Sequence, residues 1–411
     1  MNGQYKIIRI RQGKEKQLVR HHPWMFSGAV EHEKSPEEIG VGIVQIHDSQ
    51  DRFIAYGWHD PKSHILVRLL SWDAQVVPDE TWWIDMIRSA VRRRLPLFSD
   101  ARQTNAFRLI HGEADFLPGI VADLYGSTIV CIISARVGWD HRQVVVTTLR
   151  KLLNPSRIIV STDSSFCGIE QMKETTEWHE GESVTVPATV ESIRFRELGL
   201  LYGMDPVEGQ KSGFFCDQRD NRARVGTYAS GRTCLDAFSY SGAFSLNLLA
   251  SGARSVTAVD SSAAALRQLE ANLEANGKNR RIPSDAASRL TVRQADVFSF
   301  LREMETDHYD LIILDPPKLA QTKGQVEGAL RAYKDLNRLA IGKIRRGGIV
   351  ATFSCSSGVS REQFKTMIAW AAKDAAREVQ ILETLGQGPD HPVRLSFPES
   401  EYLKGFILAV L

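Results

Sequence analysis

Hydrophobic residues follow two different patterns along the chain. Short apolar runs separated by turn residues lie at 41–46, 53–58 and 65–70, and strands at this spacing predict a small β-barrel over residues 1–75. In residues 201–411, strand-like apolar runs instead alternate with segments whose apolar residues have helical spacing. Such alternation is typical of a parallel sheet with helices on both faces. The chain is therefore predicted to be an α/β protein that begins with a small barrel.

Residues 76–200 mix both patterns and predict an α/β middle domain. Its expected elements are helices over 78–100 and 139–153, strands over 129–133 and 157–161, and a hairpin over 184–201. Three arginines at 92–94 end the first of these helices. The helix dipole alone favours cations at that end, and this effect is the expected explanation for them.

The C-terminal domain is expected to contain parallel strands followed by an antiparallel pair. The parallel strands are expected at 233–237, at 255–260, in a run ending at residue 296, at 309–315 and at 348–354. The closing pair is expected at 379–385 and 405–411. A helix is expected over 263–276, ended by Gly277 because glycine readily adopts the left-handed conformation common at helix C-termini.

Charge is balanced over the whole chain but not along it. Lysines and arginines number 51 and aspartates and glutamates 49, a formal net charge of +2, which argues against a protein that coats nucleic acid by bulk charge. Residues 1–30, however, contain six basic side chains and one acidic one. Lys14, Lys16 and Arg20 in this segment are therefore candidates for contacts with nucleic-acid phosphates, the alternative being an ordinary solvated surface.

The cysteines and the apolar runs bear on the cellular compartment. Five cysteines are scattered along the chain without a C-x-x-C pair, so neither a disulfide framework nor a metal site is expected. The sequence shows no signal-peptide pattern and no apolar run of about 18 residues. These observations predict a cytoplasmic protein without a membrane span.

Four aspartates stand at the ends of four successive predicted strands: Asp236, Asp260, Asp296 and Asp315. The carboxyl ends of strands in an open α/β sheet border the ligand crevice, so these side chains are expected to converge on one molecule. Carboxylates after the second and third strands can accept from ribose hydroxyls and from an adenine amine, which predicts an adenosine cofactor. No G-x-G-x-x-G or Walker phosphate loop is present, and this favours S-adenosylmethionine over NAD or ATP. Helix capping is the alternative role of a lone aspartate at such a position.

A rigid loop and a thiol follow two consecutive predicted strands. Residues 315–318 read Asp-Pro-Pro-Lys, and two prolines hold such a loop extended, so that Asp315 can grip the edge of a planar base. A plain rigid turn is the alternative. Cys355 ends the next strand among serines and a glycine, where a thiol can act as a nucleophile. Cys131 and Cys234 lie inside apolar runs, where burial should leave them inert.

Several strings of residues extend over nearly the whole chain and point to one family. The most specific are 208–222 (EGQKSGFFCDQRDNR) and 354–356 (SCS), and others are 13–16, 22–30, 107–115, 236–244 (DAFSYSGAF), 315–318 (DPPK), 390–392 and 402–405. Together they resemble the bacterial ribosomal RNA large-subunit cytosine-5 methyltransferase family. The resemblance implies an N-terminal PUA-like RNA-binding barrel, an α/β middle domain and a C-terminal Rossmann-like class I methyltransferase domain.

The resemblance also implies an activity and a set of site residues. A thiolate at Cys355 would add to carbon 6 of cytosine while Asp315 holds the N3 and amino edge of the base, and S-adenosylmethionine would methylate carbon 5. Lys318 joins the candidate RNA-binding residues. The candidate cofactor-binding residues are Arg219, Asp236, Phe238, Tyr240, Gly242, Asp260, Asp296, Val297 and Asp315.

Two positions depart from the family's pattern, and other functions stay open. Residues 161–163 read Ser-Thr-Asp where Arg-Ser-Asp is usual, which weakens the case for RNA contact by the middle domain. Cys216 adds a rival thiol, although it precedes the first strand of the C-terminal sheet. One alternative is methylation of a base nitrogen with Cys355 as a bystander, and another is a non-catalytic RNA-binding assembly protein. Ribosomal RNA is the expected partner, and a homodimer remains an open alternative.

Overall fold

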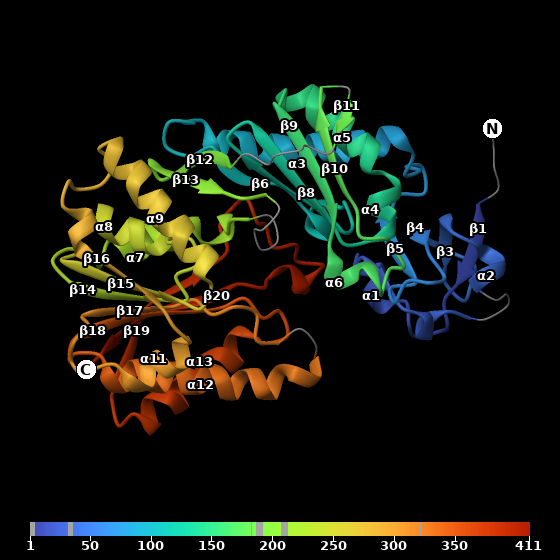
Figure 1. Ribbon diagram of the computed structural model, residues 1–411. Helices are drawn as coiled ribbons and strands as arrows, with labels where there is room; N and C mark the ends of the chain where they lie inside the picture. The colour runs from blue at the N-terminus through green and yellow to red at the C-terminus, as the bar shows by residue number, and fades with distance from the viewer. Residues whose placement is uncertain (1–4, 32–35, 182, 186–191, 207–212, 321–322) are drawn as a thin grey trace.

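The computed structural model of the chain describes residues 5–31, 36–181, 183–185, 192–206, 213–320 and 323–411. The N-terminal and C-terminal bodies lie at opposite ends of the molecule, with the middle domain between them (Figure 1). Within the described ranges, every helix is too short or too polar to span a lipid bilayer.

The N-terminal body is built on a five-stranded sheet in the order β1-β3-β4-β5-β2. The strands are β1 (Lys6–Arg9), β2 (Trp24–Met25), β3 (Gly42–His47), β4 (Phe53–His59) and β5 (Val67–Ser71), with α1 (Lys16–Val19) and α2 (Pro36–Ile39) in the connections. Ile8, Val44 and Ile46 belong to its core, because alternate side chains of a strand share a face. The three strands predicted here are confirmed, the last one beginning at Val67.

The middle domain is a six-stranded sheet in the order β11-β10-β9-β8-β7-β6. Its strands are β6 (Ala106–His111), β7 (Ile120–Tyr125), β8 (Thr128–Ile133), β9 (Arg157–Thr162), β10 (Thr176–Glu180) and β11 (Ser183–Thr185). Its helices are α3 (Glu80–Arg94), α4 (Arg136–Asp140), α5 (Arg142–Leu153) and α6 (Ser164–Cys167). Trp83 of α3 and Val145 of α5 share one apolar core with the sheet, so both helices cover the same face.

Three predictions for the middle of the chain are wrong in their bounds. The helix expected over 78–100 is α3, which ends at Arg94 because Pro96 cannot continue an α-helix, and a 3-10 turn follows. The helix expected from residue 139 is interrupted, so that α5 begins only at Arg142. The hairpin expected over 184–201 consists instead of β12 (Ile193–Glu197) and β13 (Leu200–Met204). Residues 186–191 of that range lie outside the described residues.

This hairpin follows the middle sheet in sequence but is fastened to the C-terminal domain. Glu197 and Arg222 of α7 (Arg219–Gly226) form a buried ion pair through two hydrogen bonds of 2.7 Å. The Asn276 side chain also bonds both the backbone N–H and the carbonyl of Leu201, at 2.8 and 2.7 Å. Because the side chains of Glu197 and Asn276 satisfy buried groups, the hairpin is held against the helices that flank the site.

The C-terminal sheet has seven strands in the order β16-β15-β14-β17-β18-β20-β19. The strands are β14 (Thr233–Ala237), β15 (Ser255–Asp260), β16 (Leu290–Gln294), β17 (Leu311–Leu314), β18 (Gly348–Ser354), β19 (Val379–Gly386) and β20 (Lys404–Val410). The first five of these run parallel, and β20 pairs antiparallel with both β18 and β19, which confirms the predicted arrangement.

Helices cover both faces of this sheet, as predicted (Figure 1). On one face lie α7, α8 (Ala243–Ala250) and α9 (Ala263–Lys278), and on the other lie α11 (Val297–Glu303), α12 (Val326–Lys343) and α13 (Arg361–Asp374). The short α10 (Ala286–Arg289) precedes β16. The predicted stop at Gly277 is wrong, because α9 runs on to Lys278 and the left-handed residue is Arg280, with φ of 54°. The third strand ends at Gln294 rather than at Asp296.

Candidate active site

The carboxyl ends of β14, β15, β17 and β18 lie at one edge of the C-terminal sheet, because these strands run parallel. Asp236 is the penultimate residue of β14, and Asp260 is the last residue of β15. Asp315 and Cys355 directly follow β17 and β18. The fold thus brings side chains that are up to 119 positions apart, from Asp236 to Cys355, to a single edge.

The turn after β14 contains three residues in the left-handed backbone conformation: Phe238 (φ 68°), Tyr240 (φ 47°) and Gly242 (φ 80°). This conformation is costly for residues with a Cβ atom, and such strain concentrates at functional sites. Gly242 requires glycine for a further reason, because a Cβ there would lie 2.4 Å from Cγ of Leu269. The Tyr240 backbone N–H donates to the carboxylate of Asp260 at 2.9 Å, which ties the turn to the end of β15.

Two buried polar atoms beside this turn have unused hydrogen-bonding capacity. Oδ2 of Asp236 accepts bonds from the Ser245 backbone N–H and hydroxyl, at 2.9 and 2.6 Å. Oδ1 of Asp236 and Oγ of Ser239 are buried and find no hydrogen-bond partner among the described residues. Burial also raises the pKa of Asp236 to about 6. Because buried polar groups are normally paired, these two atoms fit a bound cofactor that supplies the missing bonds.

Asp260 and Asp296 both accept backbone hydrogen bonds. Oδ1 of Asp260 accepts from the Ser262 N–H at 2.8 Å. Asp296 is exposed and caps α11, accepting from the Ser299 N–H at 2.9 Å, while its neighbour Val297 is buried in the core. Capping, which the sequence left open, is therefore a structural role of Asp296. Cofactor contact by Asp260, Asp296 and Val297 stays a prediction.

Asp315 is half-buried and accepts a hydrogen bond from the side-chain amide of Gln218 at 2.9 Å. The amide of Asn221 in turn donates to Gln218 at 2.6 Å, which fixes its orientation. Burial raises the pKa of Asp315 to about 7, and the nearby carboxylate of Asp217 also raises it, whereas the bond from Gln218 lowers it. Both protonation states of this carboxyl group are therefore populated near neutral pH.

Cys355 differs from the other cysteines in its exposure. Of the five cysteines, all of which fall within the described ranges, only Cys355 is not buried. Its sulfur lies 3.9 Å from the carbonyl oxygen of Pro316, so the thiol borders the Asp-Pro-Pro loop. Burial raises the pKa of the rival Cys216 well above its ordinary value and that of Cys131 and Cys234 to about 12. Those three thiols are therefore protonated at neutral pH.

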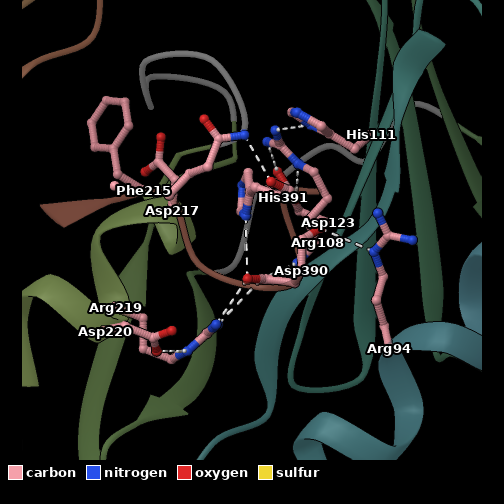
Figure 2. Close-up of polar contacts among 12 residues, drawn as sticks. Arg94, Arg108, His111, Asp123, Phe215, Asp217, Arg219, Asp220, Asp390 and His391 are labelled. Carbon is pink, nitrogen blue, oxygen red and sulfur yellow. Dashed lines mark hydrogen bonds and ion pairs between the residues drawn. The ribbon is translucent and has the colours of Figure 1, made fainter. Parts of the chain in front are cut away.

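Arg219 pairs with Asp390 and with its neighbour Asp220 (Figure 2). It is 3% exposed, and its guanidinium donates to both carboxylate oxygens of Asp390, at 2.8 and 3.2 Å. The ring of Phe98 lies 4.4 Å from the guanidinium carbon. The structure thus gives Arg219 a role between the domains, and its contact with the cofactor stays a prediction.

Asp390 joins the C-terminal domain to the middle domain. Its carboxylate accepts from the Arg108 backbone N–H at 2.9 Å and its carbonyl accepts from Arg94 at 3.0 Å (Figure 2). Although burial opposes it, His391 and Arg219 hold the pKa of Asp390 well below its ordinary value. The helix-dipole explanation is incomplete for Arg94, which is 1% exposed and also pairs with the buried Asp115 at 2.6 Å.

The candidate RNA-binding residues all reach solvent. Lys14, Lys16 and Arg20 are exposed in and around α1, and Lys318 is exposed just after the two prolines. Residues 207–212, which include the start of the 208–222 string, lie outside the described residues. Sequence reasoning missed Gln218 and Asp390 as site-forming residues, although both fall within strings that it singled out by resemblance.

Comparisons with known proteins agree with this architecture. Family models of a PUA-like domain and of an S-adenosylmethionine-dependent methyltransferase match residues 8–72 and 108–392. A protein of Aeromonas salmonicida named ribosomal RNA large subunit methyltransferase I is 36% identical over 405 residues, 98% of each chain. One of the same name from Pseudoalteromonas translucida is 35% identical over 408 residues, 98% of this chain and 99% of that one.

Two solved structures show the same fold over the whole chain. A candidate S-adenosylmethionine-dependent methyltransferase from Streptococcus mutans has a TM-score of 0.80 at 22% identity, covering 98% of this chain and 100% of that one. A candidate methyltransferase complexed with SAH has the same TM-score and identity and covers 98% and 99%.

The sheet order, the strained turn and the two unpartnered polar atoms beside it define an S-adenosylmethionine-dependent methyltransferase with a PUA-like N-terminal domain. The cofactor is therefore S-adenosylmethionine, and the non-catalytic alternative is set aside. More narrowly, the chain belongs to the ribosomal RNA large subunit methyltransferase I family.

Replacing Arg219 with Met should loosen the joint between the domains. The change leaves the buried carboxylate of Asp390 without its bidentate partner, which we expect to lower the free energy of unfolding by about 3 kcal/mol. Urea denaturation followed by tryptophan fluorescence measures this loss. Arg331→Met removes an exposed ion pair with Glu327 and should cost at most about 0.5 kcal/mol. Equal losses in the two variants would contradict a structural role for Arg219.

Proposed function

We propose that this enzyme methylates carbon 5 of a cytosine in large-subunit (23S) ribosomal RNA through a covalent bond between Cys355 and carbon 6 of the base. The observation that supports this most is the distance of 3.9 Å between the Cys355 sulfur and the Pro316 carbonyl oxygen, which joins a thiol to a base-gripping loop. The name of the relatives, ribosomal RNA large subunit methyltransferase I, supports the substrate class.

The thiol and the carboxyl group have complementary tasks in this reaction. Carbon 5 of cytosine becomes nucleophilic only after an electron pair adds at carbon 6, and the Cys355 thiolate supplies it by forming a C–S bond. Asp315 in its neutral form donates its proton to N3, where negative charge develops. S-adenosylmethionine supplies the electrophilic methyl group. Loss of the carbon 5 proton to a base then breaks the C–S bond and returns the thiolate, and the proton on N3 goes back to the Asp315 carboxylate, so that the product base and the carboxyl group are both restored to their neutral forms.

The cofactor would be held at the turn after β14. Each oxygen of the Asp260 carboxylate already accepts one backbone bond, but a carboxylate oxygen can accept two, so a pair of ribose hydroxyls can still be bound. Asp296 keeps the same spare capacity toward an adenine amine. Asp236 and the turn residues Phe238, Tyr240 and Gly242 complete this set, with Val297 supplying apolar contact.

Substrate RNA would be held by basic residues of the N-terminal body. Lys14, Lys16 and Arg20 are exposed, as phosphate contacts require. His21, next in sequence, stacks on Trp72 at 4.8 Å between ring centroids, and both line a cavity of about 520 Å³ that reaches α3. Lys318 would contact the RNA near the target base. Since the base must leave any stack to reach Asp315, a structured RNA with an accessible cytosine is the expected substrate.

The closest alternative keeps the fold and the cofactor but methylates a base nitrogen. The Asp-Pro-Pro loop favours it, because an aspartate there can accept a hydrogen bond from a base amine. The exposure of Cys355 beside that loop has no purpose in such a reaction, and we therefore favour carbon 5.

Replacing Cys355 with Ala should abolish methyl transfer to large-subunit ribosomal RNA, because it removes the group that adds to carbon 6 and the other four cysteines are buried. Transfer of tritiated methyl groups and bisulfite sequencing measure the loss and the product. Cys167→Ala, at a buried thiol of the middle domain, is the control and should keep full activity. Methylation of a base nitrogen by the Cys355→Ala variant would overturn the covalent mechanism in favour of the alternative.

The pH dependence of kcat/KM should report the protonation of Asp315 in the free enzyme. Its pKa of about 7 means that the proton-donating form is present below pH 7 and is lost above it, so at pH values where Cys355 is already a thiolate kcat/KM should fall about tenfold per pH unit. In Asp315→Asn, kcat/KM at pH 7 should be about 100-fold lower and this decline should disappear. Asp374→Asn, at an exposed residue of α13, should keep the wild-type profile. A profile unchanged in Asp315→Asn would contradict the role.

Changing Lys14, Lys16 and Arg20 together to Gln should weaken RNA binding without changing the chemical step. Three lost phosphate contacts should reduce the slope of log Kd against log salt concentration by about 2 to 3. Filter binding of a large-subunit RNA fragment at several salt concentrations measures the slope. Lys278→Gln with Arg331→Gln, two exposed residues of the C-terminal domain, should leave it unchanged. An unaltered slope in the triple variant would exclude this surface.

A further inference from the structure

Lys404 is a buried lysine beneath the loop that contains Cys355. It is the first residue of β20 and lies opposite Ser354, the last residue of β18, in the antiparallel pair. Its side chain is 2% exposed. The ammonium donates hydrogen bonds to the carbonyl of Ser356 at 2.7 Å and to that of Tyr402 at 2.8 Å. One of its two partners is therefore the residue that follows the thiol.

No carboxylate of the described residues lies close enough to this ammonium group to form an ion pair with it. Within the described part of the chain Lys404 forms no ion pair, and both of its hydrogen-bond acceptors are neutral carbonyls. Burying an ammonium without a counter-charge is costly, and burial lowers the pKa of Lys404 to about 8. The thiolate form of Cys355 acts in the opposite direction and raises that pKa. When Cys355 is in its thiolate form, it is thus a counter-charge for this buried cation.

The loop around the thiol is fixed by contacts to three other elements. The hydroxyl of Ser356 accepts a hydrogen bond from the Ala320 N–H at 3.1 Å and lies 3.1 Å from the hydroxyl of Tyr333 in α12. The carbonyl of Ser356 is bound by Lys404. The loop is therefore held from the segment after β17, from α12 and from β20, which fixes the backbone on either side of the Cys355 thiol relative to Lys404.

We propose that Lys404 is a positioning residue for Cys355, whose buried ammonium charge favours the thiolate and whose hydrogen bond to Ser356 orients the loop. This inference rests on the proposed function only in assigning a purpose to the thiolate. The coupling between the two groups is a property of the folded protein without RNA. It is also reciprocal, since an interaction that favours the lysine cation in the presence of the thiolate favours the thiolate equally in the presence of the cation.

Other charged groups near Lys404 and Cys355 also shift the pKa of Lys404. Glu401 raises the pKa of Lys404, whereas Arg361 and Lys318 lower it. Tyr333 faces Cys355 from α12, and burial raises its pKa to about 12, so its hydroxyl stays neutral over the useful range. Only Lys404 among these cations is both buried and bonded to the Cys355 loop.

Alkylation of Cys355 by iodoacetamide tests the proposal in the full-length protein without RNA or cofactor. Mass spectrometry of the Cys355 peptide gives the rate at each pH. Lys404→Met keeps the approximate length of the side chain but removes its charge. In this variant the midpoint of the rise in alkylation rate with pH should move up by about one pH unit, and the rate at pH 7 should fall about tenfold. Lys404→Arg keeps the charge and should retain most of the rate, and Lys373→Met on the surface of α13 should match the wild type. A Lys404→Met midpoint equal to that of the wild type would overturn the proposal.

A second measurement does not depend on folding of the lysine variants. Titration of the Lys404 side chain by NMR, in protein labelled at lysine Cε, should show a lower midpoint in Cys355→Ala than in the wild type. An unchanged midpoint would also overturn the proposal. Failure of the proposed function is distinguishable, because methylation by Cys355→Ala would remove the purpose of the thiolate without altering either titration.

Discussion

The position of β18 determines the geometry of the whole site. All seven of its residues are buried, and it is held between β17 in parallel register and β20 in antiparallel register. Parallel pairing with β17 aligns the ends of the two strands, so that Cys355 follows one and Asp315 follows the other. Antiparallel pairing with β20 brings the start of that strand, at Lys404, to the same end. A one-residue slip would turn every side chain of β18 to the opposite face.

Much of the C-terminal domain could be predicted because its signals are local. The bounds of β14, β15 and β18 coincide with the predicted apolar runs. The prediction at Gly277 was wrong for a local reason as well: α9 continues one residue past the glycine, to Lys278, and the chain turns at Arg280. Glycine permits a left-handed stop but does not impose one, and Gly277 stays inside the helix.

The contacts between the domains could not be predicted because they join distant positions. Arg94 and Asp390 are separated by 296 residues. Glu197 lies in strand β12, whereas its partner Arg222 lies in helix α7. A buried ion pair requires both partners at once, and neither residue alone differs from an ordinary surface charge in the sequence. The partner of Gln218 could not be predicted either, because Gln218 lies 97 residues from the Asp315 carboxylate that it binds. The motif strings contained Asp390, Arg222 and Gln218 but neither Arg94 nor Glu197. Only the fold assigns the partners of these residues.

Burial shifts the pKa values of two ionisable groups near the thiol toward neutral pH, from opposite directions. It raises the pKa of Asp315 to about 7 and lowers that of Lys404 to about 8. The proposed reaction needs a thiolate to attack carbon 6 and, at the same time, a protonated carboxyl group to donate to N3. In water a thiol ionises only at alkaline pH, whereas a carboxyl group is protonated only at acidic pH. In the proposed mechanism, Lys404 beneath the thiol would favour the thiolate at lower pH, while burial raises the pKa of Asp315 and keeps that carboxyl protonated to higher pH. If the proposed mechanism holds, the burial of charged groups that makes this site costly to fold is also what would allow the thiolate and the neutral carboxyl group to exist at the same pH.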